Sequence, residues 1–247
     1  MTDTTPHTGK ALQQFWVVVP AAGVGERMQA DRPKQYLRLA GKTILEHTLS
    51  RLLEHPAVAG VVAVIADRDR YWETTAFAGD SRVIVAAGGR ERCHSVLNGL
   101  AKLAALVAPQ QWVLVHDVAR PCICQADIDA LIAAIAGDAD GYLLGAPVRD
   151  TMKQTDGSGR VIATAERAGL WHAFTPQLFR LGQLQAALSD CLAKGMLVTD
   201  EASAMELCGF HPQMVAGSEQ NIKITRPSDL PLAEWILKTQ RQDTTLE

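Results

Sequence analysis

A loop of small residues followed by two cations is the first feature of the sequence that could do chemistry. Residues 20–28 read PAAGVGERM, and the small side chains at 21–25 allow a ligand to approach the backbone closely. Their N–H groups can then face phosphate oxygens. Arg27 follows at once, and Lys34 comes seven residues later. A guanidinium and an ammonium so placed could stabilise the charge that develops on a reacting polyphosphate.

The same loop also fits a plainer interpretation, a tight strand-to-helix connection that binds nothing. Gly23 and Gly25 form neither the Gly-x-Gly-x-x-Gly fingerprint of dinucleotide-binding proteins nor the Gly-x-x-x-x-Gly-Lys-Ser/Thr pattern of a P-loop. The small residues alone leave both interpretations open. The two cations that follow them favour a phosphate site.

Alternating strands and helices must position this loop. Continuous apolar runs rich in β-branched residues predict strands that are buried on both faces, at 15–19, 61–65, 82–85, 112–116 and 142–146. Apolar residues at helical spacing predict helices between them, at 45–53, 96–104 and 126–136. The alternation predicts an α/β fold with a doubly wound, mostly parallel, Rossmann-like sheet.

The pattern changes after residue 147. Two mainly polar, strand-like segments at 151–155 and 160–165 flank the sequence DGSG, which predicts a β-hairpin. A two-stranded hairpin is marginally stable alone, so we expect this arm, residues 149–170, to pack on the main domain or on another subunit. Beyond the arm we expect helices at 181–194, 200–208 and 228–239, and short strands at 213–216 and 222–225.

Composition and charge exclude several classes of protein. The 247 residues are 47% hydrophobic and 21% charged, which suits one soluble domain with a sizeable core. A net charge of −3 excludes a broadly basic surface for nucleic acid, and no apolar run approaches the ~20 residues of a membrane span. Residues 1–14 are polar and lack the features of a signal peptide, so we expect a disordered extension of a cytoplasmic protein. The five cysteines match no disulfide or zinc pattern, and we expect reduced thiols.

Several short blocks together resemble those of the 2-C-methyl-D-erythritol 4-phosphate cytidylyltransferase family. They are PAAGVGERM at 20–28, PKQY at 33–36, GGRER at 88–92, HDVARP at 116–121, APVRDT at 146–151, TPQ at 175–177, TDEAS at 199–203 and NIKIT at 221–225. The resemblance covers roughly residues 17–235. It implies one nucleotidyltransferase domain at 15–247, arm included, that transfers the cytidylyl group of CTP to 2-C-methyl-D-erythritol 4-phosphate and releases pyrophosphate.

The resemblance also implies roles for individual residues. The catalytic group would comprise Arg27, Lys34, Arg167 and Lys223. The nucleotide would bind to Ala21, Ala22, Gly23, Gly25, Gly88, Arg90, Ser95, Asp117 and Val118. The acceptor phosphate would bind to Arg120, Thr151, Arg167, Thr175, Thr199 and Lys223. Asp117 follows a predicted strand, where ligands bind in open α/β sheets, and would contact a Mg²⁺ ion held mainly by the triphosphate. In a homodimer, Thr151 and Arg167 would reach the partner's active site.

Three residues depart from the family pattern. Val118 stands where alanine is usual, Arg90 and His94 stand where other side chains are common, and Arg90 adds positive charge near the nucleotide. By contrast, we expect Asp200 and Glu201 to begin a capped helix rather than to form a catalytic pair, because adjacent residues on a helix do not face each other. We expect none of the seven histidines to be catalytic.

Two alternative functions remain open. One is a cytidylyltransferase for another polyol phosphate, such as ribitol 5-phosphate, which would differ in the acceptor contacts. The other is a non-catalytic nucleotide-binding dimer, which would not need Arg27, Lys34, Arg167 and Lys223 together.

Overall fold

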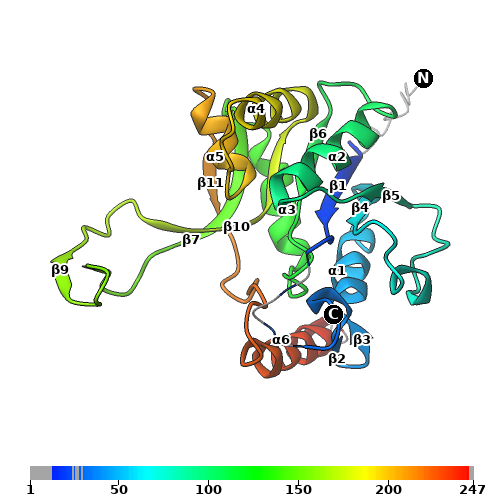
Figure 1. Ribbon diagram of the computed structural model, residues 1–247, viewed down its shortest axis with the longest axis horizontal. Coiled ribbons are helices and arrows are strands. Elements are labelled where there is room, and N and C mark those ends of the chain that lie inside the picture. The colour runs from blue at the N-terminus through cyan, green and yellow to red at the C-terminus, as the bar shows by residue number, and fades with distance from the viewer. Residues whose placement is uncertain (1–12, 24, 26–27, 29, 245–247) are drawn as a thin grey trace, which may run out of the picture.

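The computed structural model describes residues 13–23, 25, 28 and 30–244, and its centre is a seven-stranded sheet with the order β11-β7-β10-β6-β1-β4-β5 (Figure 1). Its strands are β1 Phe15–Pro20, β4 Val58–Ile65, β5 Val83–Ala87, β6 Trp112–Val115, β7 Gly141–Pro147, β10 Trp171–Arg180 and β11 Gln213–Ala216. Neighbouring strands pair in parallel except around β10, which is antiparallel to both β6 and β7. The predicted mostly parallel sheet is confirmed.

Helices cover both faces of the sheet. Helices α1 (Ile44–Leu53) and α3 (Gln125–Ala134) contribute to the core on one face. The other core contains residues of α2 (Arg92–Ala104), α4 (Leu181–Ala193) and α5 (Glu201–Leu207). Successive residues of β1 point into opposite cores, as Val17 and Val18 do. Because these strands are buried on both faces, they are apolar at nearly every position in the sequence.

Smaller elements pack at the end of the sheet toward which β1 points (Figure 1). They are the 3-10 helices Lys34–Tyr36 and Trp72–Thr74, the strands β2 (Arg38–Leu39) and β3 (Lys42–Thr43), and helix α6 (Asp229–Thr244). Ile236 and Leu237 of α6 join Leu39, Ile44 and Ile224 in a third apolar cluster. This cluster ties the C-terminal helix to the segments that carry Lys34 and Lys223.

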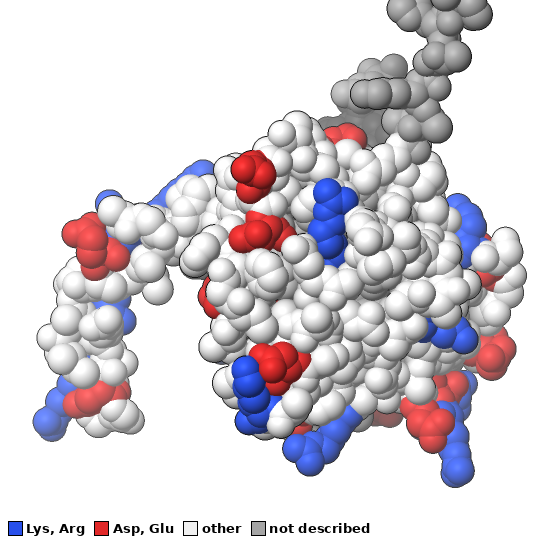
Figure 2. Space-filling view, turned by 90° about the horizontal axis from the view of Figure 1, so that it is seen from above, with Lys and Arg blue, Asp and Glu red and all other residues white. Residues whose placement is uncertain are grey.

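The predicted hairpin forms an arm that projects from the body. Its strands are β8 (Lys153–Thr155) and β9 (Val161–Thr164), which pair antiparallel, and every residue of both strands is exposed. Figures 1 and 2 show the arm extending well beyond the rest of the molecule, with side chains of both charges along it.

One predicted strand does not form, and one strand was not predicted. Residues 222–225 form no strand, because the backbone N–H of Ile224 donates to the carbonyl of Ala119 in a loop rather than to a sheet neighbour. Strand β10 was missed, because Pro176 and a register shift between Ala173 and Gln177 interrupt its pattern. The polar segment 1–12, expected to be disordered, lies outside the described residues. Across the part of the chain that the structure covers, no helix has the length and apolar character needed to cross a membrane.

Candidate active site

A pocket of about 510 Å³ opens where β1 and β6 end. It is lined by Pro20, Ala22, Gly23, Lys34, Gln35, Gly89, Arg90, Glu91, Arg92, Ser95, Asp117, Val118, Ala119 and Lys223. These residues come from the ends of three parallel strands and the loops after them, from the start of α2, from the first 3-10 helix and from the segment before α6. This is the edge of an open α/β sheet at which ligands bind.

The small-residue loop after β1 is held tightly against its neighbours. The Ala21 carbonyl accepts a 2.6 Å hydrogen bond from Gln35 Nε2. A Cβ on Gly88 would stand only 2.3 Å from the Cβ of Ala22, so Gly88 allows the loop after β5 to meet the loop after β1. The backbone of Gly25 has φ +71°, and a Cβ there would lie 2.9 Å from both Cβ and Cγ of Lys34. Glycine at 25 therefore lets the loop pack directly on Lys34.

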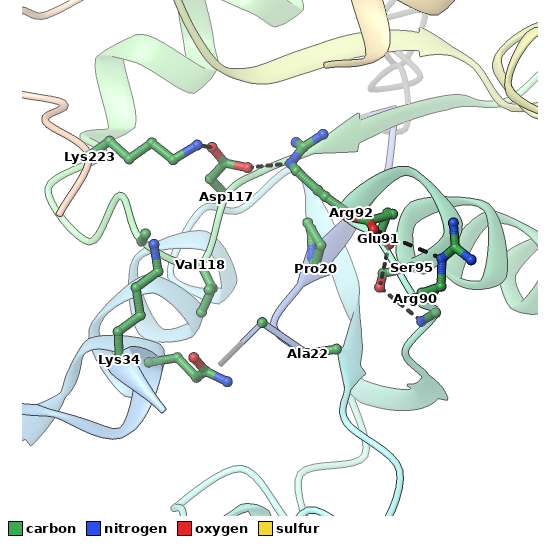
Figure 3. A pocket seen from close by; sticks show the side chains of 14 residues that line it. Pro20, Ala22, Lys34, Arg90, Glu91, Arg92, Ser95, Asp117, Val118 and Lys223 are labelled. Atoms are coloured by element: carbon green, nitrogen blue, oxygen red, sulfur yellow. Dashed lines mark hydrogen bonds and ion pairs between the residues drawn. The ribbon is translucent and has the colours of Figure 1, made fainter. Parts of the chain in front are cut away.

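Ser95 fixes the second loop of the pocket. Its hydroxyl accepts from the backbone N–H of Gly89 at 3.0 Å and donates to the carbonyl of Glu91 at 3.2 Å. These bonds join the turn after β5 to the first turn of α2. Arg90 lies on the rim and directs its mostly exposed side chain away from the pocket centre (Figure 3).

A chain of alternating charges crosses the pocket wall. Asp117 accepts from Arg92 Nε at 2.9 Å through Oδ1 and pairs with Lys223 Nζ at 2.6 Å through Oδ2 (Figure 3). Arg92 also donates two hydrogen bonds, of 2.7 and 3.1 Å, to the carboxylate of the fully buried Glu201. Burial opposes ionisation of Asp117, but Arg92 and Lys223 outweigh it and hold the pKa of this carboxyl well below its usual range. Asp117 is therefore an anion at neutral pH.

A buried hydrogen-bond network supports Asp117 from behind. The backbone N–H of Asp117 donates to Thr175 Oγ1 at 3.0 Å, and that hydroxyl lies 3.1 Å from His116 Nδ1. Because His116 Nε2 faces the carbonyl of Arg120 at 3.1 Å, Nε2 carries the proton and Nδ1 accepts from Thr175. Burial lowers the pKa of His116 to about 4, so the ring is neutral. These contacts give His116 a structural role.

Arg120 lies next to this network and is almost fully buried. It donates to the carbonyl of Asn221 at 2.6 Å and stacks over the ring of Phe174. Asn221 in turn donates to the carbonyl of Thr175 at 2.8 Å. The segment that carries Lys223 is thus anchored to β10 and to the loop after β6.

Lys34 lies on the wall opposite Arg92 (Figure 3). It begins a 3-10 helix after Pro33, and its Nζ donates to the carbonyl of Ile224 at 3.3 Å. Of the described residues that line the pocket, Lys34, Arg90, Arg92 and Lys223 are basic, whereas Glu91 and Asp117 are acidic. The excess of cations favours an anionic ligand.

The structure sorts the predicted site residues into three groups. Those lining the pocket are Ala22, Gly23, Lys34, Arg90, Ser95, Asp117, Val118 and Lys223. Those packed behind or beside it are Ala21, Gly25, Gly88, Arg120 and Thr175. Those exposed and not lining it are Thr151, Arg167 and Thr199. Arg27 lies outside the described residues.

Sequence reasoning assigned no role to Arg92 and described Glu201 only as the start of a helix. Asp200 does cap α5, as expected, by accepting from the backbone N–H of Ser203. Glu201 points instead to Arg92, which is 109 positions away in the chain. An arginine inside the GGRER block was the available signal for one partner. Glu201 lies in the TDEAS block in the same way, but neither block indicates that the two side chains pair.

The basic side chains of the pocket suit an anionic ligand, and comparison with known proteins identifies the family. The model of the family "IspD: 2-C-methyl-D-erythritol 4-phosphate cytidylyltransferase" matches residues 15–239. The chain belongs to this family. The resemblance found in the sequence blocks is therefore confirmed.

Individual IspD family members and solved structures are similar over nearly their whole length. A 2-C-methyl-D-erythritol 4-phosphate cytidylyltransferase of Pseudomonas putida (strain GB-1) is 56% identical over 226 residues, which are 91% of this chain and 95% of that protein. The one from Tolumonas auensis is 53% identical over 93% of this chain and 99% of its own. The IspD crystal structure from Francisella tularensis is 35% identical, with a TM-score of 0.77 over 91% of this chain and all of that chain.

Proposed function

We propose that the protein transfers the cytidylyl group of CTP to 2-C-methyl-D-erythritol 4-phosphate, a step of isoprenoid biosynthesis. Membership of the IspD family supports this activity. The observation that carries the proposal for the site is the cationic pocket at the strand ends, in which Arg92 and Lys223 lie on either side of Asp117 and Lys34 also lines the wall. A pocket of this size and charge suits a nucleoside triphosphate and a second phosphate-bearing substrate.

The chemistry is an in-line displacement at the α-phosphorus. A phosphate oxygen of the acceptor forms a bond to the α-phosphorus as the bond to the bridging oxygen of pyrophosphate breaks. The attacking phosphate is already ionised, so the protein need not supply a covalent nucleophile or a strong base. Its contribution is orientation and stabilisation of negative charge.

Each part of the pocket has a defined task in this reaction. The backbone around Ala22, Gly23 and Gly89 receives the nucleotide, because small residues allow close approach. Lys34 stabilises charge on the phosphates, and Lys223 holds the acceptor phosphate. Arg27, which lies outside the described residues, keeps the role implied by its sequence block, alongside Lys34.

A divalent cation such as Mg²⁺ fits the donor set. Mg²⁺ takes one or two carboxylates together with substrate phosphates and water, and Asp117 offers one ionised carboxylate at the pocket. Within the described residues there is no cluster of three or more metal-ligating side chains, so the triphosphate would supply most ligands. The ion would neutralise part of the triphosphate charge.

The arm supports a homodimer with shared active sites. Its strands bury no residue within the chain, and Val161 and Ile162 are 62% and 68% exposed. Thr151 and Arg167 both lie on the arm, away from the pocket of their own chain. A second subunit would cover the apolar side chains and bring these two residues to its pocket.

The activity is tested by a pyrophosphate-release assay. CTP, ATP, GTP and UTP are each supplied with 2-C-methyl-D-erythritol 4-phosphate or with ribitol 5-phosphate. We expect release only with CTP and the first acceptor. Release with ribitol 5-phosphate at equal efficiency, or none with any pair, would refute the proposed function.

Mixed dimers test the shared site. Arg167→Ala and Lys34→Ala chains, each nearly inactive alone, are unfolded, mixed in equal amounts and refolded. If the arm acts in trans, half of the dimers are mixed and each has one intact site, so about a quarter of the wild-type activity returns. A chain carrying both substitutions, mixed with itself, is the control. No recovery in mixtures shown to exchange subunits would mean that Arg167 does not serve the partner.

A further inference from the structure

Glu201 is the most deeply buried carboxylate connected to the active site, yet it does not line the pocket. It sits in the first turn of α5 with no exposed surface. Both of its oxygens accept from the guanidinium of Arg92, at 2.7 and 3.1 Å. A paired, two-bond geometry of this kind fixes the plane of a guanidinium as well as its position.

The frame behind Glu201 is rigid. Asp200 caps α5, and its side chain also accepts from Gln177 Nε2 at 2.8 Å. The same Gln177 side chain accepts from the backbone N–H of Ala202 at 2.9 Å. Because Gln177 belongs to β10, the start of α5 is tied directly to the central sheet. Glu201 is thereby held as a fixed anchor.

The side chains of Arg92 and Lys223 are held by carboxylates, although the backbone around Lys223 is anchored to β10 and to the loop after β6. Arg92 stands on the first turn of α2 with its side chain at the open pocket, and Lys223 is on an irregular segment. Both contact Asp117, one through each carboxylate oxygen (Figure 3). The order of charges is therefore Glu201, Arg92, Asp117, Lys223, and only the first is outside the pocket.

We propose that Glu201 is a positioning residue for the transfer reaction, acting through Arg92 to hold Asp117 and Lys223 in their reactive arrangement. Removing its charge leaves Arg92 with one anionic partner and gives the pocket one more net positive charge. Anionic substrates would still be attracted, but the groups that orient them would no longer be held. The inference depends on the proposed function, since orientation is the main contribution that such a reaction needs.

The test compares Glu201→Gln and Glu201→Asp with the wild type. Glutamine keeps the size of the side chain and removes its charge, whereas aspartate keeps the charge and shortens the reach to Arg92. Glu206→Gln is the matched control, because Glu206 is exposed on the same helix and lies outside the pocket. We expect kcat of Glu201→Gln to fall about tenfold or more, as losses of supporting groups around a site commonly do. The affinity for CTP should change by less than about threefold, and Glu201→Asp should lie between Glu201→Gln and the wild type.

A double-mutant cycle with Arg92→Met distinguishes positioning from general destabilisation. If Glu201 acts through Arg92, the variant with both substitutions should have about the same kcat as Arg92→Met alone. If the fold-losses in kcat of the two single variants instead multiply in the variant with both substitutions, the proposal is wrong. A folded Glu201→Gln with wild-type kcat would also overturn it. Thermal melting establishes folding, and if Glu201→Gln does not fold, Glu201→Asp enters the cycle in its place.

Crystal structures give a readout that does not depend on activity. In Glu201→Gln we expect Arg92 to leave its contact with Asp117 Oδ1, and in Glu206→Gln we expect it to stay. An unchanged Arg92 and Lys223 in Glu201→Gln would refute the positioning role even if the wild type proved inactive. A wild type that releases no pyrophosphate would refute the proposed function instead.

Discussion

Replacing Lys34 with methionine isolates the contribution of one charge to the reaction. Methionine keeps an unbranched side chain that can pack beside Gly25, but it carries no ammonium. An ammonium about 4 Å from a phosphate oxygen gains about 4 kcal/mol at an effective dielectric constant near 20. The pocket is open to solvent and Lys34 already donates to the carbonyl of Ile224, so we expect a smaller effect. Loss of a single donor to a developing oxyanion costs about 3 kcal/mol, which is about a hundredfold in kcat.

The assay measures kcat from pyrophosphate release at saturating CTP and acceptor, and the affinity for CTP by calorimetry. We expect kcat of Lys34→Met to fall about a hundredfold while the CTP dissociation constant rises less than about tenfold. Lys102→Met is the control, because Lys102 is exposed on α2 away from the pocket. A kcat within threefold of the wild type at saturating substrates would show that Lys34 does not stabilise the transition state. An equal loss in affinity and none in kcat would assign it to ground-state binding alone.

Three further substitutions follow from the geometry around Asp117 and Lys34. Gly25→Ala would place a Cβ 2.9 Å from Lys34, in a backbone conformation that costs about 1–2 kcal/mol for residues other than glycine. We expect a lower kcat in the pyrophosphate-release assay and a lower melting temperature. An unchanged kcat would argue against close packing of the loop on Lys34. Since Arg92 and Lys223 keep the pKa of Asp117 low despite its burial, the carboxylate stabilises the fold above about pH 4 and this stabilisation is lost as the pH falls. Urea titrations measure the difference in unfolding free energy between the wild type and Asp117→Asn. This difference should be about 3 kcal/mol near pH 7 and should shrink below pH 4. A difference that does not depend on pH would contradict the ion pairs of Asp117. Thr175→Val should lower the free energy of unfolding by about 1–3 kcal/mol, because it leaves the buried N–H of Asp117 without an acceptor. Thr175→Ser keeps the hydroxyl and should restore that free energy. Equal stability of the two variants would refute the role of the Thr175 hydroxyl as an acceptor.

The sequence predicted the architecture well because the relevant forces are local and periodic. Strands buried on both faces must be apolar at every position, and β1, β4 and β6 were recognisable for that reason. The hairpin was recognisable from its glycine-containing turn. Strand β10 was not, since its pairing with β7 shifts register around Pro176 and its neighbours β6 and β7 lie far along the chain.

For the site, residue types and spacing determined which loops carry the phosphate chemistry. Blocks such as those around Lys34, Asp117 and Lys223 were sufficient to indicate the family, because a combination of short motifs is specific where each alone is not. Tertiary structure decided which of their side chains face the pocket. It placed Thr175 and Arg120 behind the wall and brought Glu201 to Arg92. Contacts of this kind join segments that are distant in the chain. They depend on how the sheet and its helices pack, so the periodicity of the sequence does not indicate them.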